Sequence, residues 1–378
     1  MATKVGDAQN IGDVLERGTR NVVRTSGGDL YIVAIDTVAS PEAIAVWKYS
    51  GSWAEQDAAN RPADGSGDIE GVSVAIDSSD KIHIFWYGSG DASFVYTTFD
   101  TSGDQWNGGD AASTEEVAAE VDGPQNKLYK LLVSITVDSA DKPHVAWQDS
   151  DALHGTDYDT MWYANKVGAN WSTALEVEGF NAQKDCRSPE ITVNDSDIPL
   201  IVYINETDSD VTAAKGDQND ASAFTLVDVD STVSTTYPSI AVDSDGNAWI
   251  AYEDSDDTID IAKQSADWTS GWTIVSDGDT GKYVNLVING TDVYVFYEEL
   301  TTTWNMVYNK YDGSWDGETA LTSGTHYHYA KARWSLNNNV SYATYGIDYV
   351  FGDGTDLYYD NLSIGAAPAA YKQKVIFI

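Results

Sequence analysis

The sequence contains a single cysteine, Cys186, and few basic residues. One cysteine among 378 residues excludes an intrachain disulfide framework and any metal site built from several cysteines. Lysine and arginine total 21 against 60 aspartates and glutamates, which gives a formal net charge of −39. Such a chain lacks the cations that displace counterions from DNA or RNA, and anionic lipid repels it. We therefore expect no nucleic acid and no membrane among its partners.

Long hydrophobic runs are also missing. No stretch approaches the roughly 18 consecutive apolar residues of a membrane span. Residues 1–16 carry no apolar core of the kind found in secretory leaders, so no signal peptide is visible. High net charge is also a mark of disorder, but hydrophobic residues make up 42% and aromatic residues 12% of the chain. That composition predicts a folded protein.

One pattern recurs along the chain: a short apolar strand, a polar turn, and a second strand that ends in an aromatic residue. The turn residue precedes the aromatic by nine positions in four copies, namely Asp77 to Trp86, Asp138 to Trp147, Asn194 to Tyr203 and Asp243 to Tyr252. Three looser copies bring the total to seven, about 50 residues apart, and their turn residues are Thr25, Asn289 and Asn337.

Each copy continues with a third and a fourth strand, as in residues 161–164 and 173–177. No segment keeps a helical period of 3.6 residues. Four strands repeated in this way are typical of a β-propeller. We therefore predict an all-β chain that forms a single seven-bladed β-propeller of four-stranded antiparallel blades over residues 19–365. An array of separate β-sandwiches is the alternative, and the lack of Pro- or Ser-rich linkers disfavours it.

The two ends of the chain offer two ways to close the propeller. Residues 1–18 are a candidate ring-closing strand, because residues 12–16 resemble the fourth strand at 174–178 in position and pattern. Residues 366–378 could instead complete the last blade. If the N-terminal segment closes the propeller, this tail is spare and becomes a candidate docking segment through its apolar end, Val375, Ile376, Phe377 and Ile378.

The turns between third and fourth strands are rich in glycine and tryptophan, as in Tyr-Ser-Gly-Ser-Trp at 49–53 and Tyr-Asp-Gly-Ser-Trp at 311–315. Here the chain resembles the sialidase superfamily, whose Asp-box (BNR) repeat places an Asp–Gly–Trp turn at this point of each blade. The box is degenerate, since only Asp104 and Asp312 keep an acidic residue near the family position. The resemblance implies a structural role, in which the tryptophan packs between sheets and the polar residue closes the turn.

Sialidases grip a substrate carboxylate with three arginines, and this chain does not reproduce their arginine motif. Arg24 and Arg333 lie on expected innermost strands and Arg187 lies just before another, which leaves a carboxylate site in the channel open. Among 60 acidic residues, some pair will have glycosidase spacing by chance, so no catalytic pair can be selected. With no recognisable catalytic constellation, we expect a protein that is not an enzyme.

Acidic residues gather after the aromatic strands, at equivalent places in successive repeats. In a propeller, equivalent loops fall on one rim, so we predict a ligand-binding acidic rim formed by Asp149, Asp151, Asp157, Asp159, Asp208, Asp210, Asp254, Asp256 and Asp257. Dense oxygen ligands can hold Ca²⁺, but no copy carries a complete Asp-x-Asp-x-Asp-Gly loop. We expect no cofactor, with Ca²⁺ as the one candidate. A solvated acidic rim without a ligand is the alternative.

The predicted function is that of a structural or interaction propeller in a phage or virus particle, as a capsid decoration or a tail or fibre protein. It rests on the resemblance to non-catalytic propellers of such particles. The expected partners are other virion or surface proteins and host glycan, and the expected location is the virion or an extracellular surface. The alternatives are a secreted glycoside hydrolase of sialidase-like type and a soluble propeller lectin.

Overall fold

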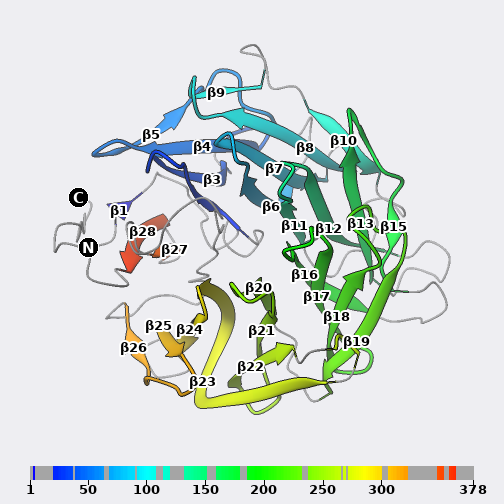
Figure 1. Cartoon of the computed structure of the whole chain (residues 1–378). Helices are drawn as coiled ribbons and strands as arrows, with labels where there is room; N and C mark the ends of the chain where they lie inside the picture. The colour runs from blue at the N-terminus through cyan, green and yellow to red at the C-terminus, as the bar shows by residue number, and fades with distance from the viewer. Residues whose placement is uncertain are drawn as a thin grey trace. The chain divides into compact units, whose positions relative to one another are not determined.

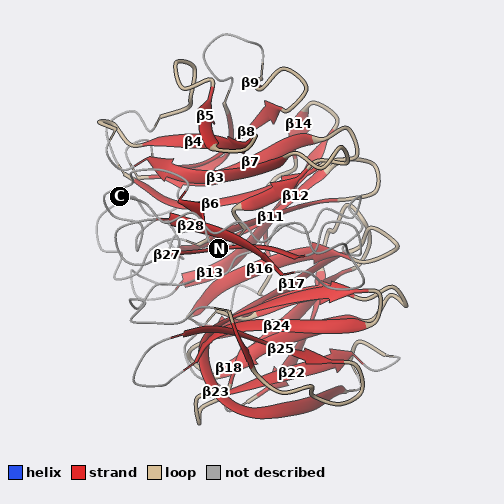
Figure 2. Cartoon of the chain, turned by 90° about the vertical axis from the view of Figure 1, so that its left-hand side faces the viewer, coloured by secondary structure: helices blue, strands red, loops and turns tan. Residues whose placement is uncertain are grey.

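Every regular element in the described part of the chain is a β-strand (Figure 2). No helix there is long and apolar enough to cross a membrane. The computed structural model describes residues 3–4, 20–36, 39–63, 68–89, 92–107, 114–119, 132–150, 159–178, 185–231, 237–264, 267–269, 271–299, 305–321, 347–352 and 357–362.

The chain divides into two compact units, and the first combines Met1–Ala119 with His326–Ile378. Its three antiparallel sheets contain strands from both parts of the sequence. The first sheet has the order β2 (Val22–Arg24), β3 (Leu30–Asp36), β4 (Ala43–Tyr49), β5 (Trp53–Gln56). The second has the order β6 (Ile69–Ile76), β7 (Lys81–Gly88), β8 (Ser93–Asp100), β10 (Glu115–Ala119), with β9 (Gln105–Trp106) also paired to β8. The third has the order β27 (Ile347–Gly352), β28 (Leu357–Leu362), β1 (Thr3–Lys4).

The second unit, Glu120–Thr325, contains the remaining strands. One sheet joins β11 (Val133–Val137), β12 (Pro143–Ser150) and β13 (Asp159–Val167), with β14 (Asn170–Trp171) and β15 (Leu175–Glu176) both paired to β13. The next has the order β16 (Cys186–Val193), β17 (Pro199–Asn205), β18 (Asp210–Gly216), β19 (Phe224–Asp230). A third runs through β20 (Ser239–Val242), β21 (Ala248–Glu253), β22 (Thr258–Gln264), β23 (Trp272–Asn289), β24 (Asp292–Glu299), β25 (Asn305–Tyr311) and β26 (Thr319–Ala320).

The long strand β23 serves two four-stranded groups (Figure 1). Its first half pairs with β22 and its second half pairs with β24. It is therefore the fourth strand of one group and the first strand of the next. The first strands β11, β16, β20 and β23 contact one another in that succession within this unit.

The four predicted hairpins share one register. The central pairs are Val74–Ile84, Ile135–Val145, Ile191–Ile201 and Ile240–Ile250. In each hairpin the polar turn residue accepts hydrogen bonds from two backbone N–H groups of its own turn. Asp138, for example, accepts from Ala140 N at 2.9 Å and from Lys142 N at 2.8 Å. A short side-chain acceptor at this position therefore closes the turn, as its sequence pattern predicted.

The turns also tie neighbouring sheets together. Asp197 accepts from the backbone N of Ser139 at 2.8 Å and from its hydroxyl at 2.6 Å. Asp80 holds Ser26 in the same way, at 2.7 and 2.6 Å. Both aspartates have positive φ, a backbone conformation that Asp tolerates better than most residues. These contacts act as staples between consecutive hairpins.

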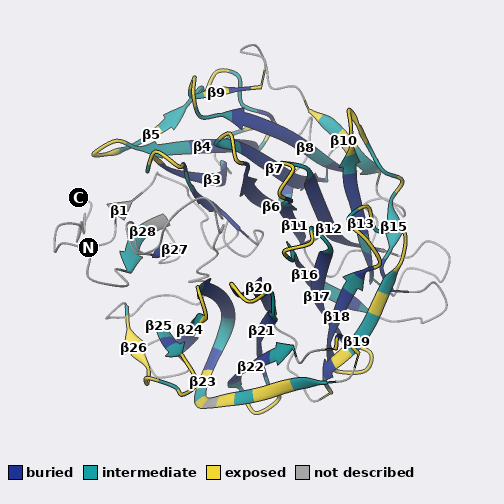
Figure 3. Cartoon of the chain, viewed as in Figure 1, coloured by how far each residue is buried: buried dark blue, intermediate teal, exposed yellow. Residues whose placement is uncertain are grey.

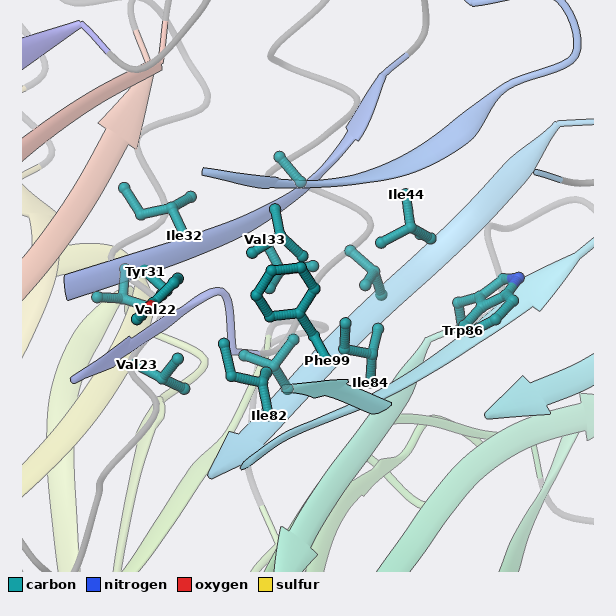
Figure 4. Packing of buried hydrophobic residues seen from close by; sticks show 14 of the residues in the cluster. Val22, Val23, Tyr31, Ile32, Val33, Ile44, Ile82, Ile84, Trp86 and Phe99 are labelled. Atoms are coloured by element: carbon teal, nitrogen blue, oxygen red, sulfur yellow. The ribbon is translucent and has the colours of Figure 1, made fainter. Parts of the chain in front are cut away.

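Each sheet buries its hydrophobic side chains against the next sheet. In the first unit, Val22, Ile32, Ile84, Trp86 and Phe99 belong to one cluster contributed by two sheets (Figure 4). In the second unit, β17 and β21 are buried along their whole length, whereas β26 is exposed (Figure 3). Burial of the middle strands explains their near-continuous apolar sequence.

The Gly/Trp turns have the structural role that the family resemblance implied. Gly51, Gly168 and Gly313 all have positive φ, which glycine adopts without strain. The ring of Trp53 packs 5.5 Å from that of Tyr359 in a different sheet, and Trp315 donates from Nε1 to the Ser276 carbonyl at 3.0 Å.

The prediction of an all-β chain with four-stranded antiparallel sheets is confirmed. The number of blades stays a prediction. Residues 12–16 and the tail residues Val375, Ile376, Phe377 and Ile378 lie outside the described residues.

Candidate functional site

The predicted rim aspartates fall at the ends of second strands and the starts of third strands in the second unit. Asp149 and Asp159 lie at the facing ends of β12 and β13. Asp210 begins β18, and the exposed Asp208 precedes it and accepts from Asn205 Nδ2 at 3.0 Å. Asp254, Asp256 and Asp257 form the turn between β21 and β22. Asp151 and Asp157 lie outside the described residues.

The structure places one of these acids, Asp159, beside residues that the rim prediction left out. We call this group the Glu206 cluster; its members are Gln148, Asp159, Asp185, Arg187 and Glu206. Arg187 contacts Asp185 Oδ2 at 2.7 Å through Nη2 and Glu206 Oε2 at 2.9 Å through Nη1. Gln148 donates from Nε2 to Asp159 Oδ2 at 2.7 Å.

Backbone contacts fix the relative positions of these side chains. Glu206 N donates to the Asp185 carbonyl at 2.7 Å, and Asp185 N donates to Thr207 Oγ1 at 2.8 Å. Asp159 N lies 3.4 Å from Asp185 Oδ1. The side chains of Arg187, Asp185 and Glu206 are 13%, 20% and 19% exposed, so the cluster is largely desolvated yet open to solvent.

Glu206 differs from an ordinary surface carboxyl in its proton affinity. Desolvation raises the pKa of Glu206, and the negative charges of Asp185 and Asp159 raise it further, while Arg187 acts in the opposite direction. A hydrogen bond to Asp185 also favours the protonated form. Glu206 is therefore suited to donate a proton.

A β-bulge positions Arg187 at the entry of β16. The register between β16 and β17 slips between Arg187 and Glu190, and Ser188 has a φ of 58°. Ser188 N points to Gln148 Oε1 at 3.4 Å, so the preceding sheet contacts the bulge. Bulges of this kind re-aim side chains and are frequent beside active sites.

A second bulge occurs at the equivalent place in β23. Its register with β24 slips between Lys282 and Asn285, and Tyr283 has a φ of 57°. Lys282 Nζ lies 3.4 Å from Glu253 Oε1 and 3.3 Å from Asp257 Oδ1. Asp257 is thus the one rim aspartate for which the structure records an ion pair with this lysine.

Of the arginines expected in a channel, Arg24 has partners in another strand and Arg333 lies outside the residues that the structure describes. Arg24 Nε donates to Asp348 Oδ2 at 2.7 Å and its Nη2 lies 3.3 Å from the Tyr359 hydroxyl. Within the described ranges, no group of three or more His, Cys, Asp and Glu side chains is arranged to hold a metal ion. Ca²⁺ binding stays a prediction.

Sequence reasoning missed Asp185, Arg187 and Glu206 as one site. Asp185 is an isolated acid 21 residues before Glu206, and nothing in the strand pattern shows that β16 starts with a bulge. The available signal was a repeated cation at the entry of a first strand, Arg187 in one copy and Lys282 in another. Only the register of the strands reveals that these positions correspond.

No protein-family model matches the chain, and no curated protein is significantly similar to it in sequence. Solved structures are similar in fold. The α-L-arabinanase of Penicillium chrysogenum, complexed with arabinobiose, is 13% identical, with a TM-score of 0.50, and the match covers 82% of this chain and 97% of that one. A mutant of the α-L-arabinofuranosidase of Fusarium graminearum is 11% identical, with a TM-score of 0.52 and the same coverages. A protein of unknown function from Dyadobacter fermentans is 12% identical over 77% of this chain and 93% of its own, with a TM-score of 0.52.

These similarities support a propeller fold, while a specific relation to sialidases stays a prediction. They also correct one expectation: the prediction that the chain is not an enzyme is contradicted, because glycoside hydrolases are among the structures it resembles. That prediction relied on the absence of a recognisable motif. A carboxylate pair has no fixed spacing in sequence, so its absence as a motif was no evidence against catalysis.

Proposed function

We propose that this chain is a glycoside hydrolase built on a seven-bladed β-propeller, with the Glu206 cluster as its active site. The observation that carries the proposal is the placement of the Glu206 carboxyl group beside two other acids: Arg187 contacts both Glu206 and Asp185, and Asp159 N lies 3.4 Å from Asp185 Oδ1. Desolvation at this place raises the pKa of Glu206. Glycoside hydrolysis needs one protonated carboxyl group and one carboxylate at the scissile bond. The Glu206 cluster supplies both kinds of group on one partly exposed site.

The roles follow from the contacts of each residue. Glu206 is the general acid and protonates the leaving oxygen, because its environment favours the protonated form. Asp159, held by Gln148, is the second carboxylate, which either activates water or attacks the sugar. Asp185 and Arg187 are positioning residues. Asp185 raises the pKa of Glu206, and Arg187 holds the carboxyl groups of Asp185 and Glu206 in place.

The similar structures support this alternative better than a particle component, since two of them are named as an arabinanase and an arabinofuranosidase. Arabinan is therefore the first substrate to test. The virion partners and the virion or extracellular location stay predictions.

The test is release of reducing sugar from arabinan, galactan and xylan by the full-length protein and by matched variants. We expect Glu206→Gln to lower kcat by about 100-fold to 10,000-fold, the usual contribution of a general acid. Asp195→Asn is the control, because it removes one charge from an exposed residue in the β16–β17 turn. The proposal is refuted if none of the three polymers is hydrolysed, or if the Glu206 variant keeps full activity.

The pH profile gives a second test of the same assignment. Activity should fall on the alkaline side as Glu206 loses its proton. Asp185→Asn removes a charge that raises the pKa of Glu206. The alkaline limb of kcat/KM should therefore move to lower pH in this variant, and an unchanged limb would contradict the role given to Asp185.

A further inference from the structure

Two tyrosine rings lie together at the start of neighbouring first strands. Tyr237 stands two residues before β20, and Tyr283 lies in the bulge of β23. Their ring centroids are 5.8 Å apart with an angle of 35° between the planes, and both side chains are partly exposed. The strands β20 and β23 contact each other, so the two rings belong to one continuous surface.

This placement differs from that of the aromatics that build the core. The aromatic residues at the ends of the second strands are almost completely buried, as Trp147, Tyr203, Tyr252 and Tyr297 show. Tyr237 and Tyr283 are instead only partly buried. Tyr283 also holds a positive φ, which is costly for a bulky residue and concentrates at ligand sites.

The cation beside the rings already has two acidic partners. Lys282 is the cation next to Tyr283, and its ammonium lies between Glu253 and Asp257. Glu253 is buried, so Lys282 compensates a charge of the protein itself. An anionic sugar would find Lys282 already paired and would meet a strongly acidic chain. An uncharged sugar has an apolar ring face that can stack on tyrosine while its hydroxyls meet polar neighbours.

The tyrosine pair and the Glu206 cluster occupy corresponding places. Arg187 and Lys282 each precede a residue of positive φ in a bulge at the entry of a first strand. Strand β16 contacts β20 and β20 contacts β23, so β20 lies between the two places. A chain of sugar rings that enters the Glu206 cluster can therefore continue across β20 toward the tyrosines.

We propose that Tyr237 and Tyr283 form a stacking subsite for uncharged sugar rings of an oligosaccharide whose scissile bond lies at the Glu206 cluster. The subsite rests on the proposed function and adds to it a substrate class, neutral oligosaccharides longer than a disaccharide. It involves no bond making or breaking, and its contribution is to affinity.

The experiment is calorimetric titration of the full-length Glu206→Gln protein, in which the expected slow turnover allows binding to be measured. The probes are disaccharides and hexasaccharides of arabinan, galactan and xylan, with oligogalacturonides of equal length as the acidic series. We expect a neutral hexasaccharide to bind more tightly than its disaccharide and than the acidic hexasaccharide. Adding Tyr237→Leu or Tyr283→Leu should weaken the neutral hexasaccharide by about fivefold to tenfold.

Two further variants separate stacking from damage to the fold. Tyr283→Phe keeps the ring and should keep the affinity. Tyr311→Leu removes an aromatic ring that packs on Trp315, in the β25–β26 region, and should leave hexasaccharide binding unchanged. If Tyr283→Phe weakens binding as much as Tyr283→Leu, the ring face is not what binds, and stacking is refuted.

The outcomes distinguish this inference from the proposed function. If the hexasaccharide binds and the leucine variants bind it equally well, the subsite is refuted while the active site stands. If the acidic series binds as tightly as the neutral series, the assigned substrate class is refuted. If no probe binds and no polymer is hydrolysed, the proposed function fails and the subsite fails with it.

Discussion

Asp138, His144 and Tyr163 are residue types of catalytic sites in a place where they cannot meet a substrate. His144 Nε2 lies 3.4 Å from Asp138 Oδ2, and its Nδ1 lies 2.8 Å from the Tyr163 hydroxyl. All three residues are buried. In the neutral imidazole, Nε2–H donates to the carboxylate and Nδ1 accepts from the tyrosine, so every polar group is satisfied. The trio is therefore structural, in contrast to the solvent-reachable Glu206 cluster.

Burial of His144 makes stability depend on pH. Desolvation lowers its pKa from 6.5, against the attraction of Asp138. Desolvation acts to raise the pKa of Asp138, but hydrogen bonds from His144 and from backbone N–H groups outweigh it and lower that pKa to about 2. Below about pH 6.5 the unfolded chain therefore takes up a proton on this histidine, whereas the folded chain does not yet do so. Stability falls as the pH decreases below about 6.5. The contribution of Asp138 is present above about pH 4 and is lost as pH falls toward 2.

We predict that His144→Gln flattens the fall in unfolding free energy between about pH 7 and pH 5. It should also cost about 1–3 kcal/mol at pH 7, because the buried network loses a member. Urea denaturation at a series of pH values measures both effects. The control is Trp249→Phe, which removes the 2.8 Å hydrogen bond from Trp249 Nε1 to Asp243 Oδ2 and no titratable group. It should lower stability and keep the slope, and an unchanged slope in His144→Gln would contradict the assignment.

At the scale of elements, two pairs of consecutive hairpins are joined by hydrogen bonds between their turns. The carboxylate of Asp197 accepts two hydrogen bonds from Ser139 in the preceding hairpin, and Asp80 does the same for Ser26. The carboxylate is acceptor for both a backbone and a hydroxyl donor, which fixes the angle between the two turns. Removing it affects the packing of two sheets as well as one loop.

Asp197→Ala should therefore destabilise the protein by about 1–3 kcal/mol, since it leaves two donors without their acceptor and places alanine at a φ of 60°. Asp197→Asn should cost less, because asparagine tolerates this conformation and keeps one acceptor oxygen. Chemical denaturation measures both. Asp195→Ala, an exposed neighbour in the same turn, should change stability by less than about 0.5 kcal/mol. Equal losses from all three substitutions would show that the staple has no special role.

These elements also show how far sequence reasoning reaches. The polar turn residues and the nine-residue interval predicted the hairpins, because turn closure and strand alternation are local. The ligand role of the rim aspartates stays a prediction, and the structure adds that Asp208 accepts from Asn205 in its own turn. The bulges at Ser188 and Tyr283 were not predicted, since serine and tyrosine are not residue types that indicate a positive φ. The bulge at Ser188 is the one beside Arg187, which contacts Glu206.

At the scale of the whole molecule, the two ends of the first unit's sequence meet in one sheet. Strand β1 pairs with β28, with Thr3 opposite Tyr359 and Lys4 opposite Tyr358. Tyr359 is also within 3.3 Å of Arg24 on β2 through its hydroxyl. Strand β1 therefore covers an edge of β28 that would otherwise present unpaired backbone groups.

This pairing favours closure of the proposed propeller by the N-terminal segment. We expect deletion of residues 1–18 to lower the melting temperature and to promote association, because the β28 edge becomes free. Deletion of residues 366–378 should leave the melting temperature nearly unchanged. Circular dichroism melts and size-exclusion chromatography of the two truncations decide between the ends. If the C-terminal truncation is the one that unfolds or associates, then Val375, Ile376, Phe377 and Ile378 belong to the last blade, and they are not a docking segment.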